Sequence, residues 1–234
     1  MFPFHLWLPE AHVEAPTDGS VILASLLLKL GGYGFIQISL PLFNVASKYF
    51  TPLIYTLAVL SIIYASLTAL RQVDLKKIIA YSSIAHMNLV VLGIFSFKLQ
   101  GLTGAIFLML AHGIVSGALF FLVGMLYERH HTRLIHYYGG IVQIMPLFSF
   151  FFISFILANL SIPGTCNFIG ELLIFVGVFQ YNTMLAFFCG FGIVLSAAYS
   201  IWIANRLIFG SLNLKYISSF LDLNLKEFSL LLPL

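Results

Sequence analysis

Four ionisable side chains stand inside long apolar stretches of the sequence. Lys29 lies in VILASLLLKLGGYGF, His86 in IIAYSSIAHMNLVVL, His112 in IFLMLAHGIVSGALF and Glu171 in CNFIGELLIF. A Lys or Asp at the centre of a membrane helix costs roughly 2.5 to 3.5 kcal/mol on the insertion scale, so such residues are functional candidates by default.

Proton relay is the chemistry that suits these four groups. Imidazole titrates near neutrality, with an unperturbed pKa of about 6.5. Burial brings the pKa values of amines and carboxylic acids toward neutrality as well. Each of the four residues lies near the middle of its own apolar stretch, which predicts a lateral row of titratable groups at one depth. A single buried histidine, however, more often serves as a hydrogen-bonded packing residue.

Smaller polar residues accompany the row. Ser116 follows His112 by four residues and Asn167 precedes Glu171 by four, which places each pair on one helix face. Tyr81 and Lys76 share the helix of His86. Tyr81 also fits a plain packing role, whereas Lys76 would help to feed protons from the basic side.

The composition identifies the class of protein. Of 234 residues, 61% are hydrophobic and only 8% are charged, whereas a soluble domain carries about a quarter charged residues. We therefore predict an all-α, polytopic transmembrane helix bundle. The net charge of +3 does not indicate nucleic acid, and Cys166 and Cys189 lack the spacing of a disulfide framework or a zinc site.

Apolar length predicts the membrane spans, since a crossing helix needs about 20 residues. The fifth span is too long for one crossing and is divided by Pro163-Gly164, which predicts a discontinuous helix. The predicted spans cover residues 20–43, 51–70, 75–97, 102–127, 140–176 and 184–206.

The basic residues gather on one side of these spans. If the chain alternates, only Lys48 and Lys98 fall on the opposite side. The positive-inside rule then places the basic side in the cytoplasm or the mitochondrial matrix. The basic side holds Arg71, Lys76, Lys77, Arg129, Arg133, Arg206 and Lys215.

Three acids and a histidine lie together before the first span, in WLPEAHVEAPTDGS. Their types would allow a metal site, but an interfacial turn is the better interpretation, and we predict no metal. In that turn Thr17, Asp18 or Ser20 would cap the helix that leads to Lys29.

The long motifs of the chain resemble one protein family. PFHLWLPEAHVEAPTDGSVILASLLLKLGGYG, DLKKIIAYSSIAHMNLV, LMLAHGIVSGALFFLVGMLYERHHTR and SIPGTCNFIGELLIF are similar to segments of the antiporter-like membrane subunits of NADH:ubiquinone oxidoreductase, respiratory complex I. The resemblance covers nearly the whole chain. It implies an antiporter-like fold in which residues 1–234 form a single transmembrane domain, the second half-channel of a proton-translocating subunit.

The resemblance also implies roles for the buried residues. Lys29 matches the bridging lysine of the family, His86 and His112 match histidines of its central hydrophilic axis, and Glu171 matches the acid at the exit side. The resemblance further implies a subunit without a redox centre or cofactor of its own, with NADH, FMN, iron–sulfur clusters and ubiquinone in the parent translocase.

The family chain is about twice as long as this one. The resemblance therefore implies a separate polypeptide, or a longer chain, that supplies the first half with its essential glutamate and lysine. Other implied partners are further membrane-arm subunits and lipids such as cardiolipin. The implied location is the mitochondrial inner membrane or, for a bacterial protein, the plasma membrane.

Three alternatives remain at this stage. The chain could belong to a related cation/proton antiporter or membrane hydrogenase. It could be an electron-transfer subunit that uses His86 and His112 as axial ligands of a haem. It could also be a structural subunit whose buried charges do no work.

Overall fold

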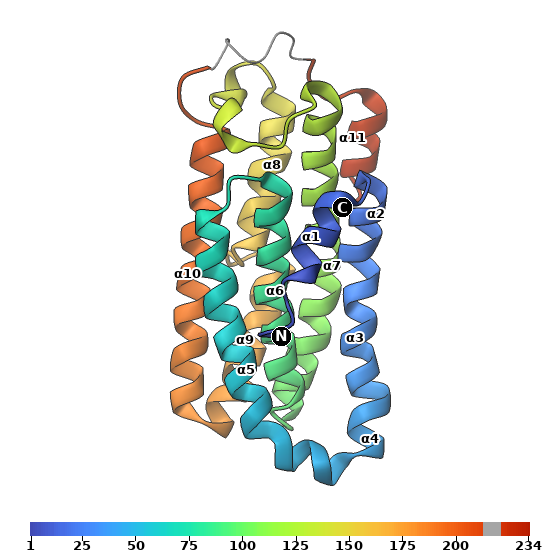
Figure 1. The fold of residues 1–234 in the computed structure, drawn as a ribbon, viewed down its shortest axis with the longest axis vertical. Helices are drawn as coiled ribbons and strands as arrows, with labels where there is room; N and C mark the ends of the chain where they lie inside the picture. The colour runs from blue at the N-terminus through green and yellow to red at the C-terminus, as the bar shows by residue number, and fades with distance from the viewer. Residues whose placement is uncertain (213–220) are drawn as a thin grey trace.

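A computed structural model describes residues 1–212 and 221–234, so Lys215 lies outside the described residues. Within these ranges the chain is a bundle of upright helices (Figure 1). The described residues form no strand, only a single bridge between Asp74 and Leu134. The expectation of an all-α, polytopic bundle is confirmed.

Five helices are long and apolar enough to cross a membrane. The first, Thr17–Leu42, contains α2 (Thr17–Ile22), α3 (Leu28–Gly34) and α4 (Leu40–Leu42), joined by π-helical turns η1 (Leu23–Leu27) and η2 (Phe35–Ser39). The other four are α5 (Asn44–Arg71), α6 (Leu75–Ile94), α7 (Leu99–His130) and α10 (Thr183–Leu207). A short helix, α1 (Trp7–Glu14), precedes them, and α11 (Leu225–Leu231) follows.

The remaining crossing consists of two short helices, α8 (Pro146–Asn159) and α9 (Cys166–Tyr181). The expected interruption at Pro163-Gly164 is confirmed. Gly164 has φ +106°, which glycine adopts without the steric penalty of a Cβ. The start at residue 140 was wrong: 141–143 form a 3₁₀ turn, and the helix begins at Pro146, whose fixed φ suits a first helical position.

The expected side-chain cap of the first span was also wrong. Pro16 is the N-cap of α2, with extended backbone and no side-chain hydrogen bond to the helix start. Thr17 is already the first helical residue, and the Ser20 hydroxyl donates back to the Thr17 carbonyl at 2.7 Å. The proline ring sets the backbone direction here, so the helix starts without a capping hydroxyl.

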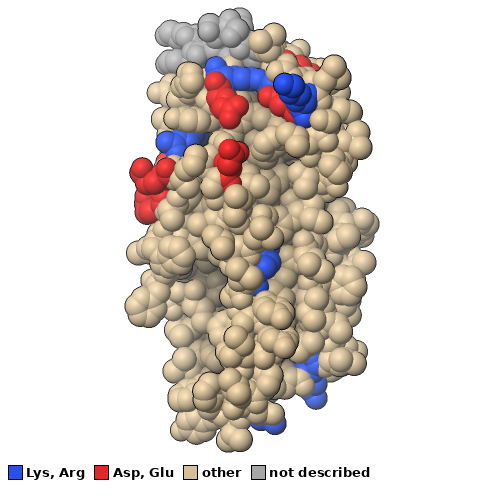
Figure 2. Space-filling view, turned by 90° about the vertical axis from the view of Figure 1, so that its right-hand side faces the viewer, with Lys and Arg blue, Asp and Glu red and all other residues tan. Residues whose placement is uncertain are grey.

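Charged residues concentrate at one end of the bundle. Figure 2 shows Lys, Arg, Asp and Glu gathered near the top of one face; the tan surface below holds one small blue patch at mid-height and small blue patches near the bottom, with no red. At the same end, α5 finishes at Arg71 and α6 starts beside Lys76, which agrees with the alternation expected from the sequence.

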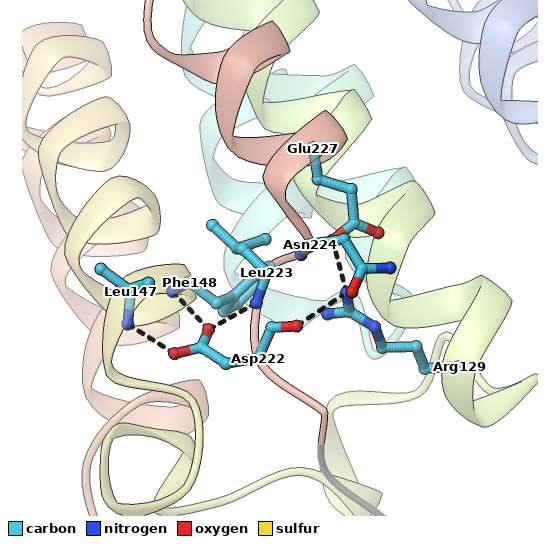
Figure 3. A network of polar contacts seen from close by, with 7 residues as sticks. All are labelled: Arg129, Leu147, Phe148, Asp222, Leu223, Asn224 and Glu227. Atoms are coloured by element: carbon cyan, nitrogen blue, oxygen red, sulfur yellow. Dashed lines mark hydrogen bonds and ion pairs between the residues drawn. The ribbon is translucent and has the colours of Figure 1, made fainter.

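A polar network fastens the C-terminal segment to this charged end (Figure 3). The Asp222 carboxylate accepts hydrogen bonds from the backbone N–H groups of Leu147 at 3.1 Å and Phe148 at 3.2 Å. It thus caps the free amides in the first turn of α8, although it comes from a distant segment. Arg129 of α7 donates to the Asp222 carbonyl and pairs with Glu227 of α11. Asp222 and Arg129 therefore connect α8, the first part of the interrupted helix, to α7 and α11.

Candidate functional site

Lys29 and His112 are in direct contact in the middle of the bundle. The Lys29 Nζ lies 2.8 Å from Nδ1 of His112 and donates to the Ala24 carbonyl at 2.6 Å. His112 is fully buried in α7. The predicted proximity of these two residues is therefore found in the structure.

His86 lies between His112 and Glu171. The His86 and His112 rings pack at 5.3 Å between centroids, and Nδ1 of His86 lies 3.0 Å from Oε1 of Glu171. The second contact has ion-pair distance but lacks hydrogen-bond geometry. The four residues thus form one continuous row in the order Lys29, His112, His86, Glu171, with each residue from a different helix.

The π-helical turn η1 shapes the position of Lys29. Such wider turns occur mostly as single bulges and frequently at functional sites. Lys29 directly follows this turn and reaches back five residues to the Ala24 carbonyl. Gly113 of α7 faces it, where a Cβ would stand 3.6 Å from the Lys29 Cε, an ordinary contact, but only 3.2 Å from the carbonyl oxygen of Ser25. The glycine therefore lets α7 approach the backbone of η1 closely.

Glu171 is positioned by a close crossing of α9 and α7. A Cβ on Gly170 would stand 2.9 Å from the backbone nitrogen of Leu108, so no larger residue fits there without a shift. The amide of Asn167 donates across the break to the Ala158 carbonyl at 2.9 Å. Gly170 therefore sets how closely α9, which carries Glu171, packs on α7, and Asn167 links α9 to the end of α8 across the interruption.

Several buried polar atoms along the row have no hydrogen-bond partner within the described chain. Buried polar groups are normally paired with protein or ordered water, so these atoms mark places where water is favourable. They are Nδ1 and Nε2 of His86, Nε2 of His112, Oγ of Ser116 and Oδ1 of Asn167. Ser116 and Asn167, which the sequence singled out, thus lie beside the row with free bonding capacity.

Lys76 and Tyr81 do not touch the row. Lys76 is only 2% exposed, yet its ammonium donates to the Ala15 carbonyl at 3.0 Å, at the basic end. Ten residues of helix, about 15 Å, separate it from His86. Tyr81 is buried within the core cluster of α6 and α7.

Two further buried polar residues lie outside the row; the sequence placed His12 in an interfacial turn and did not single out Tyr199. His12 of α1 is fully buried and stacks on Phe120 at 4.6 Å between ring centroids. Burial, with a smaller contribution from the Lys76 ammonium, lowers the pKa of His12 to about 4. Tyr199 of α10 is 1% exposed and lies close enough to Glu171 for the two groups to interact electrostatically. The serines at 196 and 200 beside Tyr199 were the one sequence signal of a polar stripe.

Metal and haem sites find no support in the arrangement. Among the described residues, no group of three or more His, Cys, Asp or Glu could hold a metal ion. Axial haem ligands approach one iron from opposite faces of a macrocycle. The His86 and His112 rings instead contact each other directly, which does not fit a haem between them.

The chain matches a family model described as NADH:quinone oxidoreductase/Mrp antiporter, TM, over residues 1–196. It is 60% identical over 234 residues to the NADH-ubiquinone oxidoreductase chain 4 of Chondrus crispus. The match covers 100% of this chain and 48% of that protein, so the chain spans about half the length of this curated relative.

Two solved structures share the fold. Respiratory complex I from Thermus thermophilus contains a chain with a TM-score of 0.91 and 32% identity, covering 99% of this chain and 49% of that one. The Mrp complex from Dietzia sp. contains one with a TM-score of 0.84 and 22% identity, covering 90% of this chain and 39% of that one. At that lower identity the second likeness shows the fold alone.

Proposed function

The chain belongs to the NADH:quinone oxidoreductase/Mrp antiporter transmembrane family, and we propose that it forms a proton-conducting half-channel in the membrane arm of an NADH:ubiquinone oxidoreductase. The observation that carries this proposal is the continuous contact from Lys29 through His112 and His86 to Glu171. Each neighbour in that row can give up or take a proton.

Proton movement along the row is a series of short exchanges. Lys29 passes a proton to Nδ1 of His112, and the opposite nitrogen, Nε2, passes one onward. Water at the unpaired Nε2 atoms of His112 and His86 would bridge the two rings, which are tilted by 48° to each other and share no direct hydrogen bond. The Nδ1 of His86 then passes a proton to the Glu171 carboxylate.

The energy for this movement comes from redox chemistry elsewhere in the parent complex. NADH, FMN, iron–sulfur clusters and ubiquinone belong to other subunits of that complex, and this chain acts as a subunit of the translocase. The location that follows is the mitochondrial inner membrane, in which the basic end of the bundle faces the matrix.

A first half-channel is the partner of this proposed arrangement, supported by the match of this chain to about half of a relative's length. The span Thr17–Leu42 carries Lys29 but lies at the edge of the bundle, with exposed apolar side chains along it. Leu26, Leu30 and Tyr33 are each more than half exposed. A neighbouring set of helices that covers this face would bring further titratable groups to Lys29.

Proton pumping by the assembled complex tests the proposal. We expect Lys29→Ala to abolish most of the pumping that accompanies quinone reduction. Lys48→Ala, which removes an exposed lysine from the opposite end, is the matched control and should pump normally. Unchanged pumping by Lys29→Ala would leave the chain as a structural subunit and sink the proposal.

A cation/proton antiporter is the second candidate, favoured by the family description, which also names the Mrp antiporter, and by the shared fold of the Mrp complex. Purification of the chain from its native membrane separates the two. Co-purifying flavin and iron–sulfur subunits would support the oxidoreductase. Their absence, together with sodium-dependent proton exchange by the purified assembly, would support the antiporter.

A further inference from the structure

Two adjoining pockets lie at the basic end of the bundle, away from the row. The first, of about 250 Å³, is lined by Arg71 at the end of α5 and by Arg206 near the end of α10. The second, of about 320 Å³, shares Arg206 and extends past the end of α10 to Gly210 and Ser211. Both pockets therefore lie where the apolar helices give way to connecting loops.

The charges of Arg71 and Arg206 are not neutralised by the chain. Among the described residues, neither arginine has an ion pair or a hydrogen bond from its guanidinium, and no Asp or Glu lines either pocket. Asp74, the nearest acid in the sequence to Arg71, interacts with Lys77 instead. Four other cations of this end are engaged by an acid or by a backbone carbonyl, namely Lys76, Lys77, Arg129 and Arg133.

The walls of the pockets are fixed by backbone hydrogen bonds. Ile135 donates to the Val73 carbonyl at 3.0 Å, which ties the α5–α6 connection to the loop after α7. Gly140 donates to the Phe209 carbonyl at 3.3 Å, which ties that loop to the end of α10. The pockets are therefore preformed, and a partner would bind without the cost of ordering these loops.

The second pocket offers more to a peptide than to a lipid tail. A Cβ on Gly210, where φ is +107°, would meet no atom within 4 Å, so the space beside this backbone is open. An acyl chain needs apolar walls, whereas an extended peptide needs hydrogen-bonding side chains for its backbone. Most of the side chains that line this pocket are polar: His136, Tyr138, Asn205, Arg206 and Ser211.

We propose that the two pockets form a docking site for an acidic segment of another polypeptide on the water side of the basic end. Carboxylates of that segment bind the guanidinium groups of Arg71 and Arg206, and the side chains of Asn205 and Ser211 hydrogen-bond its backbone. Arginine suits this task because its planar donors bind both oxygens of a carboxylate at once. Complementary charge of this kind selects the partner and fixes its register. The site lies away from the row and does not depend on proton conduction by the row.

Zero-length coupling in the assembled complex tests the site, because a carbodiimide joins an amine only to a carboxylate that the amine already contacts. Arg71→Lys and Arg206→Lys keep the positive charge and introduce the amine. After digestion, mass spectrometry identifies the coupled peptides. We expect each position to be joined to an Asp or Glu of another polypeptide, within a segment that holds at least two acids.

Two ion pairs within the chain provide controls. Lys77 and Glu10, whose charged atoms lie 2.9 Å apart, should be coupled in every sample. Arg129→Lys should be joined to Glu227 of the same chain, since Arg129 already pairs with that acid. Adding Arg71→Gln to Arg206→Lys removes one of the two cations and should lower coupling at position 206 by about fivefold, with no change in the Lys77–Glu10 product.

The unmodified complex gives a second measurement that needs no variant. Phenylglyoxal labels free arginines, so a docked acidic segment should slow labelling of Arg71 and Arg206 several-fold at low salt compared with high salt, which screens ion pairs. Labelling of both arginines at a rate that salt does not change would overturn the proposal. So would coupling of Lys77 to Glu10 in a sample where neither introduced amine joins an acid of another polypeptide. Joining of those amines only to this chain or to a lipid carboxylate would overturn it too.

Discussion

The ammonium of Lys29 and Nδ1 of His112 stand 2.8 Å apart, so a single proton lies between the two nitrogens in either tautomer of the histidine. The ammonium donates to a bare Nδ1, or the Nδ1–H donates to a neutral amine. The pair can therefore exchange a proton without moving either helix. A lysine that titrates would use this contact, whereas one that only supplies a positive charge would not need it.

The first prediction follows from that difference. Lys29→Arg keeps a positive charge, but a guanidinium does not release its proton under physiological conditions. We expect pumping to fall by roughly tenfold or more, equivalent to about 1.4 kcal/mol on the barrier. The rate at which vesicles acidify during quinone reduction measures the pumping. Pumping at the wild-type rate would mean that charge alone is required at this position.

The second prediction concerns the place of His86 inside the row. His86→Leu introduces an apolar side chain of similar length and removes the titratable group that, among the described residues, contacts both His112 and Glu171. We expect a loss of pumping comparable to that of Lys29→Arg. Asn88→Leu on the same helix is the control, because Asn88 only donates to the Ile84 carbonyl. If His86→Leu and Asn88→Leu pump equally well, His86 lies beside the path instead of on it.

The third prediction concerns the interruption of the broken helix. Gly164→Ala places a Cβ on a residue with φ +106°, which should cost roughly 1 to 2 kcal/mol although no atom lies within 4 Å of the new carbon. Gly34→Ala is a matched control, since its Cβ is equally unobstructed but its backbone is helical. Thermal unfolding of the purified complex compares them. A loss in Gly34→Ala that equals the loss in Gly164→Ala would contradict the assigned strain.

The fourth prediction concerns the cap that Asp222 supplies to α8. Asp222→Ala should expose the amides of Leu147 and Phe148 and cost about 1 kcal/mol, the usual value of a lost cap. Hydrogen exchange at these two amides should speed up, while exchange in α6 should not change. Asp18→Ala, which removes an exposed acid, serves as the control. Unchanged exchange at residues 147 and 148 would show that the cap does not form.

Sequence reasoning located the site because charges are rare inside the spans. Lys29, His86, His112 and Glu171 each stood out against an apolar background, and their similar depth predicted a row. The order within the row did not follow from the sequence, because it depends on how α6, α7 and α9 pack against one another. That packing includes close approaches at small residues, such as Gly170 of α9 against Leu108 of α7, which carry no charge signal.

Other features were hidden for definite physical reasons. The π-helical turn before Lys29 changes the hydrogen-bond pattern without a distinctive residue type. Tyrosine is common in membrane helices, so the sequence did not reveal that Tyr199 lies near Glu171. Lys76 was expected to feed the row, but its ammonium is turned toward the Ala15 carbonyl at the basic end, so a feeding role stays a prediction.

The proton-to-electron ratio of a Glu171→Gln variant tests the central claim most directly. Glutamine keeps the shape of the side chain and its hydrogen-bonding oxygen but cannot take a proton from His86. In reconstituted vesicles, the number of protons translocated per NADH oxidised should fall below the wild-type value. Mass spectrometry checks that the variant complex has the same subunit composition as the wild type. An unchanged ratio at an unchanged rate of quinone reduction would contradict the account, because protons would then cross without using the end of the row.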